Sequence, residues 1–284
     1  MKKLIEFNSI IVHPGKSHLD ERLATALALA ANNCIVPVFR RDAEEEEVKD
    51  CNVLVLDIGG QATDWWNTFD HHQFDRGHAP ECAFSLVAEA LGVASDLEAF
   101  FGWYATWRTI DARGPFQWAR EHGVDWSTAS TLLNPENDLI AEWWEEAAGD
   151  TPVDEALVRR LKKQGEKILA AAERFHSFCE RADQWAHPEF NGVKVMDFTW
   201  APPDEALDFG DAYAKTKGIK GGVLVSRDNR GPGLALFRRE DDPKVDFSVL
   251  EGNEAVTFAH KGGFIAKTRE GAEWAPLVRA AIKA

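Results

Sequence analysis

The stretch of the chain that decides the fold, residues 9–39, reads SIIVHPGKSHLDERLATALALAANNCIVPVF. Ser9–His13 and Cys34–Phe39 are short, apolar, β-branched runs of the kind that form buried parallel strands. Between them, Asp20–Ala31 is a strong helix former, and Ser17 begins an S-x-x-D capping pattern at its start. The stretch therefore predicts two parallel strands joined by a helix, with the right-handed crossover that such units adopt.

The same alternation continues along the chain. A third apolar run, Val53–Asp57, predicts another buried strand, and helices are expected over Cys82–Leu91 and Leu97–Ile110. The region 138–181 is amphipathic at helical spacing, which predicts outer helices that lead into a connector. We therefore expect an α/β fold whose N-terminal domain, residues 1–182, contains a parallel sheet.

The last part of the chain has a different pattern. Strand-like runs are found at 193–198, 222–226, 234–238 and 256–259, and two of them flank the turn-rich sequence DNRGPG. A final helix is expected over Glu270–Ile282. Residues 183–284 therefore predict a smaller C-terminal α+β domain.

The composition is that of a soluble globular protein, with 45% hydrophobic and 28% charged residues. The net charge of −15 argues against broad adhesion to nucleic acid, which depends on clustered Lys and Arg. No apolar run approaches the roughly 20 residues that cross a bilayer, and the N-terminus lacks a signal-peptide pattern. The four cysteines form no C-x-x-C pair. We expect a cytoplasmic protein with buried free thiols and no membrane partner.

Polar clusters interrupt the apolar pattern in the first half of the chain, and each follows a predicted strand or closes a predicted helix. Ligands of parallel sheets bind beyond the carboxyl ends of the strands, so we expect these side chains to converge. Taken singly, such residues are also compatible with surface histidines, helix caps or turn residues. The clusters contain His13, His18 and Asp20; Asp57; Asp70, His71 and His72; and Asp111.

The chemistry of these clusters indicates a metal centre. Three imidazoles and three carboxylates form a mixed nitrogen and oxygen set, which suits Mn²⁺ or Mg²⁺ and is too poor in sulfur for structural zinc. Two such ions, bridged by a carboxylate, activate water and stabilise the attacking and leaving oxygens of a phosphoryl transfer. The six predicted ligands are His13, His18, Asp20, Asp57, His71 and Asp111.

The motif His13-Pro-Gly-Lys-Ser-His18-Leu-Asp20-Glu21, followed by VLVLDIGG and FDHHQ, resembles the DHH phosphoesterase superfamily. Within it, the H-x-G-x-x-H-x-D-E pattern resembles the melanocyte-proliferating-gene branch. The resemblance implies that His13, His18 and Asp57 hold one ion. It implies that Asp20, His71 and Asp111 hold the other, with Asp57 as the bridge.

Two further residues receive roles from the resemblance. Asp70 is expected to orient an imidazole, and His72 is expected to contact the scissile phosphate. Near the end of the chain, the sequence FAHKGGFIAKT at residues 258–268 resembles the glycine motif of the same branch. It implies binding of a terminal phosphate or sugar, although an ordinary tight turn before a helix is an alternative. The expected substrate-binding residues are His260, Lys261, Gly262, Gly263 and Lys267, together with Arg227 and Arg230.

The resemblance implies a metal-dependent phosphoesterase with Mn²⁺ or Mg²⁺ as cofactor. The activity implied for this branch is 3'-to-5' exonucleolytic cleavage of RNA or short oligonucleotides. A pyrophosphatase-type phosphoanhydride hydrolase is one alternative, but it needs a denser clamp of basic residues than the C-terminal part provides. A catalytically silent module that binds metal or nucleotide is the other.

Overall fold

The computed structural model describes residues 2, 4–63, 67–75, 78–125 and 143–283. Contacts between residues divide the chain into two compact units, Met1–Glu173 and Arg174–Ala284, which we call the N-terminal and C-terminal units. The division into a catalytic domain up to residue 182 and a substrate-binding domain after it stays a prediction.

The N-terminal unit is built on a five-stranded sheet in the order β2-β1-β3-β5-β4. Strands β1, β2, β3 and β5 run parallel, and the short β4 pairs antiparallel with β5. The predicted parallel sheet is therefore confirmed. Strand β2 starts later than expected, just after Pro37, which has no N–H for the ladder. The strands are β1 Ser9–Val12, β2 Val38–Arg40, β3 Val53–Leu56, β4 Ala62–Thr63 and β5 Thr68–Phe69.

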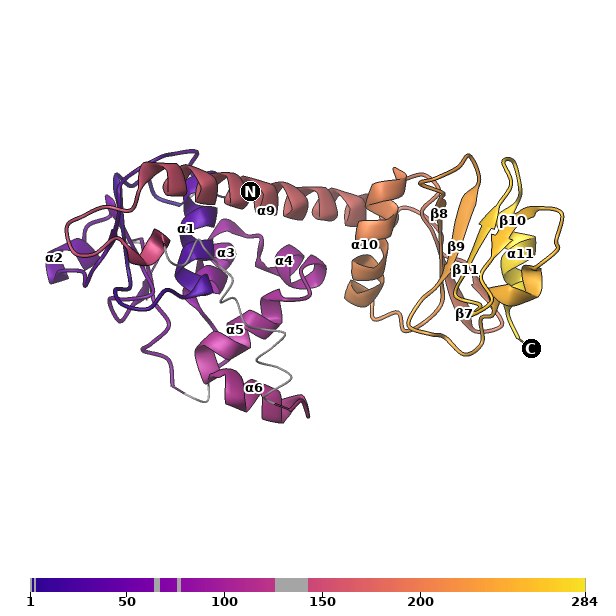
Figure 1. The fold of residues 1–284 in the computed structure, drawn as a ribbon, viewed down its shortest axis with the longest axis horizontal. Coiled ribbons are helices and arrows are strands. Elements are labelled where there is room, and N and C mark those ends of the chain that lie inside the picture. The colour runs from indigo at the N-terminus through magenta and orange to yellow at the C-terminus, as the bar shows by residue number, and fades with distance from the viewer. Residues whose placement is uncertain (1, 3, 64–66, 76–77, 126–142, 284) are drawn as a thin grey trace. The chain divides into compact units, whose positions relative to one another are not determined.

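Helices α1 and α3 lie side by side in this unit (Figure 1). The single helix predicted over 97–110 is wrong, because the chain leaves helical geometry at Phe101 and forms two helices, α4 and α5. The helices are α1 Leu19–Ala31, α2 Glu45–Val48, α3 Ala83–Leu91, α4 Ala94–Phe100, α5 Tyr104–Arg113 and α6 Pro115–Glu121.

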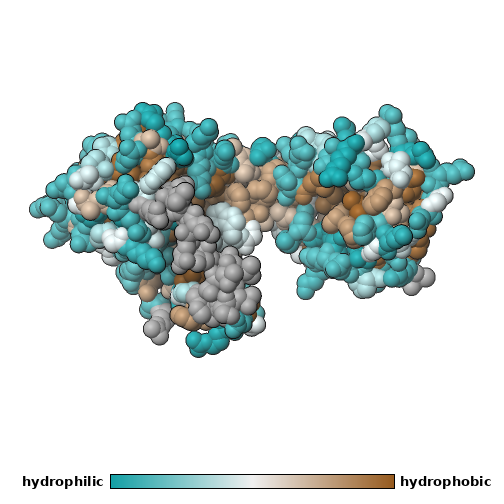
Figure 2. Space-filling model, viewed as in Figure 1, coloured by the Kyte–Doolittle hydropathy of each residue, from teal (hydrophilic) through white to brown (hydrophobic). Residues whose placement is uncertain are grey.

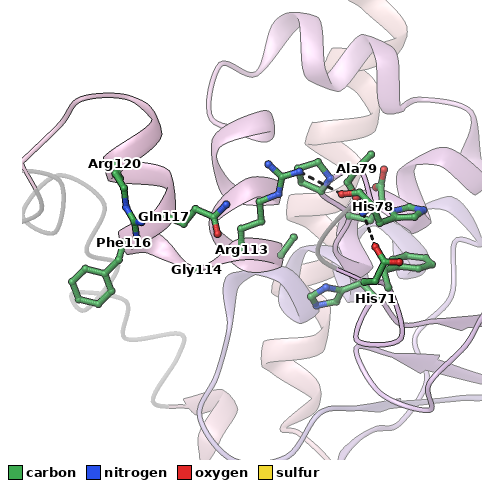
Figure 3. Close-up of a pocket in the computed structure, with 13 residues that line it drawn as sticks. His71, His78, Ala79, Arg113, Gly114, Phe116, Gln117 and Arg120 are labelled. Carbon is green, nitrogen blue, oxygen red and sulfur yellow. Dashed lines mark hydrogen bonds between the residues drawn. The ribbon is translucent and has the colours of Figure 1, made fainter.

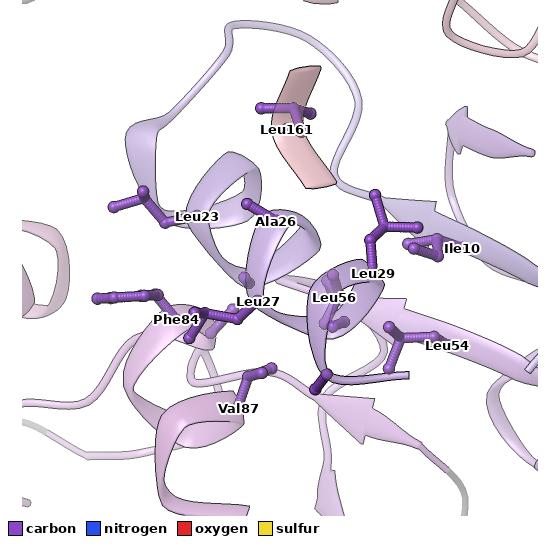
Figure 4. Packing of buried hydrophobic residues seen from close by; sticks show 14 of the residues in the cluster. Ile10, Leu23, Ala26, Leu27, Leu29, Leu54, Leu56, Phe84, Val87 and Leu161 are labelled. Atoms are coloured by element: carbon purple, nitrogen blue, oxygen red, sulfur yellow. The ribbon is translucent and has the colours of Figure 1, made fainter. Parts of the chain in front are cut away.

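The core of the N-terminal unit forms around α1. Figure 4 shows Leu27 and Leu29 of α1 among strand side chains such as Leu54 and Leu56, all of them buried. Burial of each such leucine contributes about 1.5 to 3 kcal/mol relative to exposure. This packing holds the first turn of α1 at the carboxyl end of the sheet, where the predicted ligands lie.

A long helix, α9 (Glu155–Ala182), starts in the N-terminal unit and ends in the C-terminal unit. It forms much of the amphipathic region predicted at 138–181, of which residues 138–142 lie outside the described residues. Gly165 packs directly on α1: an added Cβ would lie 2.0 Å from the carbonyl oxygen of Ala26. The two helices are therefore in backbone contact at this point.

The C-terminal unit contains a six-stranded sheet in the order β10-β11-β9-β8-β7-β6. Only β7 and β8 are parallel neighbours. The four predicted strands and the final helix are confirmed, whereas α10 and β11 were not predicted. The elements are β6 Glu189–Phe190, β7 Val193–Asp197, α10 Pro203–Thr216, β8 Val223–Arg227, β9 Leu234–Arg238, the 3-10 helix η1 Phe247–Leu250, β10 Val256–Ala259, β11 Ile265–Thr268 and α11 Trp274–Ala281.

The polarity of the surface and the state of the cysteines can be compared with what the composition predicted. Figure 2 shows hydrophilic residues over most of the visible face of each unit. All four cysteines are free, as predicted, but the expectation that they are buried is wrong for most of them: Cys82 is buried, Cys34 and Cys179 are half-buried, and Cys51 is exposed. Within the described part of the chain, no helix has both the length and the apolar character that crossing a bilayer requires.

Candidate metal centre

Asp57 is the residue on which the candidate site converges. It follows β3 directly, and its φ of 60° lies in the left-handed region, which Asp tolerates better than most residues. The side chain is buried, and neither carboxylate oxygen accepts a well-aligned hydrogen bond from the described residues. A buried carboxylate is costly unless positive charge or donors compensate it. Asp57 therefore has the environment of a cation ligand.

Three side chains from different elements meet Asp57 to form a first group. His71, just after β5, places Nε2 3.2 Å from Asp57 Oδ1 and 3.0 Å from Oδ2 of Asp111 on α5. One ligand atom from each of these residues and from Asp20 lies within 4.8 Å of the others. Burial lowers the pKa of His71, but the carboxylates of Asp111 and Asp57 outweigh it and raise the value to about 10. The four residues therefore share one small, strongly charged volume.

Asp20 is fixed in this group by contacts that the sequence pattern did not indicate. Its two oxygens accept the N–H groups of Ala83 and Phe84 at 2.8 and 2.7 Å, so it caps α3. The S-x-x-D cap predicted from Ser17 for α1 is wrong, because α1 begins without a side-chain cap. Burial raises the pKa of Asp20 well above its ordinary value. The cap orients the carboxylate within the group.

A second group of ligand-type side chains also includes Asp57. His13 follows β1 and His18 precedes α1, and their rings stack with centroids 5.1 Å apart. His18 Nδ1 lies 3.9 Å from Asp57 Oδ2, and His13 Nδ1 lies 3.9 Å from Oε2 of Glu21. One ligand atom from each of the four lies within 4.8 Å of the others. Burial lowers the pKa of His13, which favours the neutral imidazole that binds metals.

Glu21 is the residue of this group that the sequence analysis missed as a ligand. Its Oε1 accepts the indole N–H of Trp144 at 2.8 Å and lies 3.6 Å from the guanidinium of Arg40. Its Oε2 is buried without a hydrogen-bond partner among the described residues. Burial raises the pKa of Glu21 to about 8. The signal that was available is position: Glu21 follows Asp20 directly in the H-x-G-x-x-H-x-D-E pattern, three residues after His18.

The side chains of the two predicted catalytic residues, Asp70 and His72, are hydrogen-bonded to each other. Asp70 Oδ1 lies 2.7 Å from His72 Nδ1, and Asp70 Oδ2 accepts the Gly60 N–H at 2.7 Å. Burial raises the pKa of Asp70, but the hydrogen bonds from His72 and Gly60 outweigh it and lower the value. An ionised Asp70 favours the tautomer of His72 with hydrogen on Nδ1. The His72 side chain is 56% exposed, so it is accessible to a substrate.

The predicted basic residues of the C-terminal unit lie in two places. Arg227 ends β8, and its Nε donates to the carbonyl oxygen of Thr199 at 2.8 Å. Lys267 on β11 pairs with Asp228 at 2.7 Å, which places it beside the turn that contains Arg230. Both Arg227 and Arg230 are exposed. The charge of Lys267 is therefore partly neutralised within the unit.

The predicted glycine motif forms the turn between β10 and β11. The N–H of Gly262 donates to His260 Nδ1 at 2.9 Å, and that of Gly263 donates to the His260 carbonyl at 2.8 Å. Gly263 has a φ of 69°, and a Cβ there would lie 2.2 Å from Asp246 Oδ1. His260 and Lys261 also line a cavity of about 430 Å³. The role of the two glycines in anion binding stays a prediction, since their N–H donors are engaged in the turn.

The donor set of the N-terminal unit fits divalent cations. Carboxylate oxygens and imidazole nitrogens are ligands of Mn²⁺ and Mg²⁺, and no described cysteine belongs to either group. Both carboxylate oxygens of Asp57 and the Oε2 atom of Glu21 are buried and accept no hydrogen bond from the described residues, as is common for atoms that ligate a metal. The structure therefore brings all six predicted ligands together and adds Glu21.

One family model matches the chain, over residues 9–84: MYG1_exonuc, described as an uncharacterised protein family (UPF0160). The match confirms the resemblance to the melanocyte-proliferating-gene branch over this part of the chain. It spans the first three polar clusters and ends before Asp111. No curated protein matches the sequence.

Two solved structures align with most of the chain at low similarity. The pGpG-specific phosphodiesterase PggH from Vibrio cholerae is 14% identical, with 96% of each chain covered and a TM-score of 0.28. RecJ in complex with Mg²⁺ from Thermus thermophilus is 17% identical, with 96% of this chain and 48% of RecJ covered and a TM-score of 0.29. The chain thus spans about half the length of RecJ. At these TM-scores, neither alignment supports a conclusion about this chain.

Proposed function

We propose that the chain is a divalent-metal-dependent phosphodiesterase whose centre, in the N-terminal unit, holds two ions of the Mn²⁺ or Mg²⁺ kind. The observation that carries the proposal is the Asp57 carboxylate. Its oxygens are buried without well-aligned donors among the described residues, and both groups of ligand-type side chains share it. A carboxylate between two cations has this environment, because the cations take the place of hydrogen-bond donors.

The two groups divide the ligands between the ions. His13, His18 and Glu21 would hold one ion with Asp57, and Asp20, His71 and Asp111 would hold the other with Asp57. Glu21 is an addition to the set that the resemblance implies. It supplies a carboxylate to an ion that would otherwise have two imidazoles and the shared Asp57.

The chemistry of hydrolysis is divided between the ions and the protein. Bound divalent ions lower the pKa of water and stabilise the charge that develops at phosphorus. Asp70 holds the His72 ring through Nδ1, which leaves Nε2 free to bond a phosphate oxygen or move a proton at the leaving oxygen. Trp144 and Arg40 hold Glu21, so its Oε2 stays directed at His13. No covalent intermediate is required.

For the substrate, we propose RNA or a short oligonucleotide that is cleaved from its 3' end in the cytoplasm. The C-terminal unit would bind the terminal phosphate or sugar through its exposed basic side chains. His260 and Lys261 line a cavity, which supports this role. Pyrophosphate is a weaker candidate, because the Lys267 ammonium is paired with Asp228 and is not part of a dense cationic clamp.

The test combines substrate choice with metal content. The chain is incubated with Mn²⁺ and end-labelled RNA, single-stranded DNA, a dinucleotide or pyrophosphate, and bound metal is measured in parallel. We expect consumption of RNA or dinucleotide, and loss of both metal and turnover in Asp57→Asn. The matched control is Asp208→Asn, an exposed aspartate on α10. A folded Asp57→Asn chain with unchanged turnover would refute the proposal.

A further inference from the structure

A cavity of about 580 Å³ lies in the N-terminal unit between the loop after β5 and the end of α5 with α6. His71 belongs to its wall, and the same His71 contacts Asp57 and Asp111. The cavity therefore adjoins the candidate metal centre. Its volume is within the 300 to 1,000 Å³ range of small-ligand sites. A substrate held at the centre would have room for a neighbouring part here.

Two guanidinium groups line this cavity. Arg113, at the end of α5, extends toward the loop that carries His78 and Ala79 (Figure 3). Its contacts are long: 3.4 Å to the His78 carbonyl oxygen and 4.0 Å to a carboxylate oxygen of Glu121. Arg120 on α6 is exposed, and its side chain makes no ion pair with a residue that the structure describes. Both groups have capacity for a new anion, which Arg binds with two parallel N–H donors.

The loop after β5 contributes a pair of stacked rings to the wall of the cavity. Phe74 and His78 lie with ring centroids 4.2 Å apart and planes inclined by 8°. Such a flat pair offers an outer face on which a planar base can stack. The acidic residues of the wall have local partners: Asp75 accepts the His78 N–H of the same loop, and Glu81 accepts the hydroxyl of Ser85 on α3. Each of these two carboxylates therefore already accepts a hydrogen bond from a neighbouring residue.

We propose that this cavity is a nucleotide subsite, in which Arg113 and Arg120 bind a phosphate next to the scissile one and the Phe74–His78 pair receives its base. The inference rests on the proposed function, because it places a second nucleotide beside the phosphate that is cleaved. It makes the preferred substrate one with at least two phosphates. A phosphodiester without a second nucleotide would leave the subsite empty.

The first experiment separates binding at the subsite from catalysis. Hydrolysis of the 5'-phosphorylated dinucleotide pApA is compared with that of bis(p-nitrophenyl) phosphate, which has no second phosphate. Arg113→Ala should raise KM for pApA about ten- to a hundredfold, the usual effect of losing hydrogen bonds to a charged group. KM and kcat for bis(p-nitrophenyl) phosphate should not change. The matched control is Arg159→Ala, an exposed arginine on α9.

The second experiment does not depend on turnover. Adenosine 5'-monophosphate is titrated into Asp57→Asn protein, and Arg113→Ala or Arg120→Ala in that background should weaken its binding by about tenfold or more. Arg120 is exposed, so its variant remains informative if Arg113→Ala fails to fold. Unchanged binding, or equal losses on both substrates, overturns the subsite. If no phosphoester is hydrolysed but the arginines still control nucleotide binding, the proposed function fails and the subsite stands.

Discussion

Binding of metal to the candidate centre should release protons, and Glu21 should supply one of them. In the metal-free chain, burial raises the pKa of Glu21 to about 8. The carboxylates of Asp111 and Asp57 raise the pKa of His71 to about 10. At pH 7 both side chains therefore carry a proton that a metal ion must displace. Changing Glu21 to Gln removes one of these protons and nearly preserves the shape of the side chain.

The magnitude follows from the two pKa values. Removing the proton at pH 7 costs about 1.4 kcal/mol for Glu21 and about 4 kcal/mol for His71. Because each proton lost is favoured by higher pH, the logarithm of the affinity should rise with pH. For these two groups, the slope should be about two below pH 8 and about one between pH 8 and 10. In Glu21→Gln, the slope below pH 8 should fall by about one.

Calorimetry measures the number of protons that metal binding releases. Mn²⁺ is titrated into metal-free protein at pH 7 in two buffers with different enthalpies of ionisation, which gives the number of protons released. Glu21→Gln should release about one proton fewer than the parent chain. Asp208→Asn should release the same number as the parent. If Glu21→Gln binds the same number of ions and releases as many protons as the parent, Glu21 is not a ligand.

Three other outcomes follow from the structure. Because the pKa of Glu21 in the folded chain lies above its ordinary 4.5, the contribution of Glu21 to the stability of the metal-free chain should fall as pH rises from 4.5 through 8. Glu21→Gln should therefore raise Tm at pH 8 in chelator, and a lower Tm would contradict this. Asp70→Asn should lower kcat about ten- to a hundredfold without loss of metal, measured by turnover and metal analysis, because His72 loses its orienting charge. Gly165→Ala should destabilise the chain by about 2 kcal/mol or more in denaturant titration, since the new Cβ would meet the Ala26 carbonyl at 2.0 Å; an unchanged midpoint would refute the contact.

Local sequence was sufficient for the elements that carry the site. Strands β1 and β3 and helix α1 were predictable because their apolar and helix-forming runs are uninterrupted. The break between α4 and α5 was not, because a run of helix-compatible residues does not show where the chain leaves helical geometry. Strand β11 was missed because its residues were assigned to an anion-binding turn.

The approximate position of the centre could also be predicted. Parallel strands end at one edge of a sheet, so polar residues that follow β1, β3 and β5 must come close together. That rule is sufficient to place His13, Asp57 and His71 in one region. It does not give distances, and it does not say which atoms face one another.

Only the tertiary structure decided how each side chain is held. Asp20 caps α3, whose first N–H groups lie more than sixty positions away in sequence, and this contact replaces the local cap that the sequence pattern predicted. Glu21 is buried and oriented by Trp144, 123 positions away. Neither contact leaves a local pattern, because long-range packing brings the partners together and also excludes the water that would otherwise solvate these carboxylates.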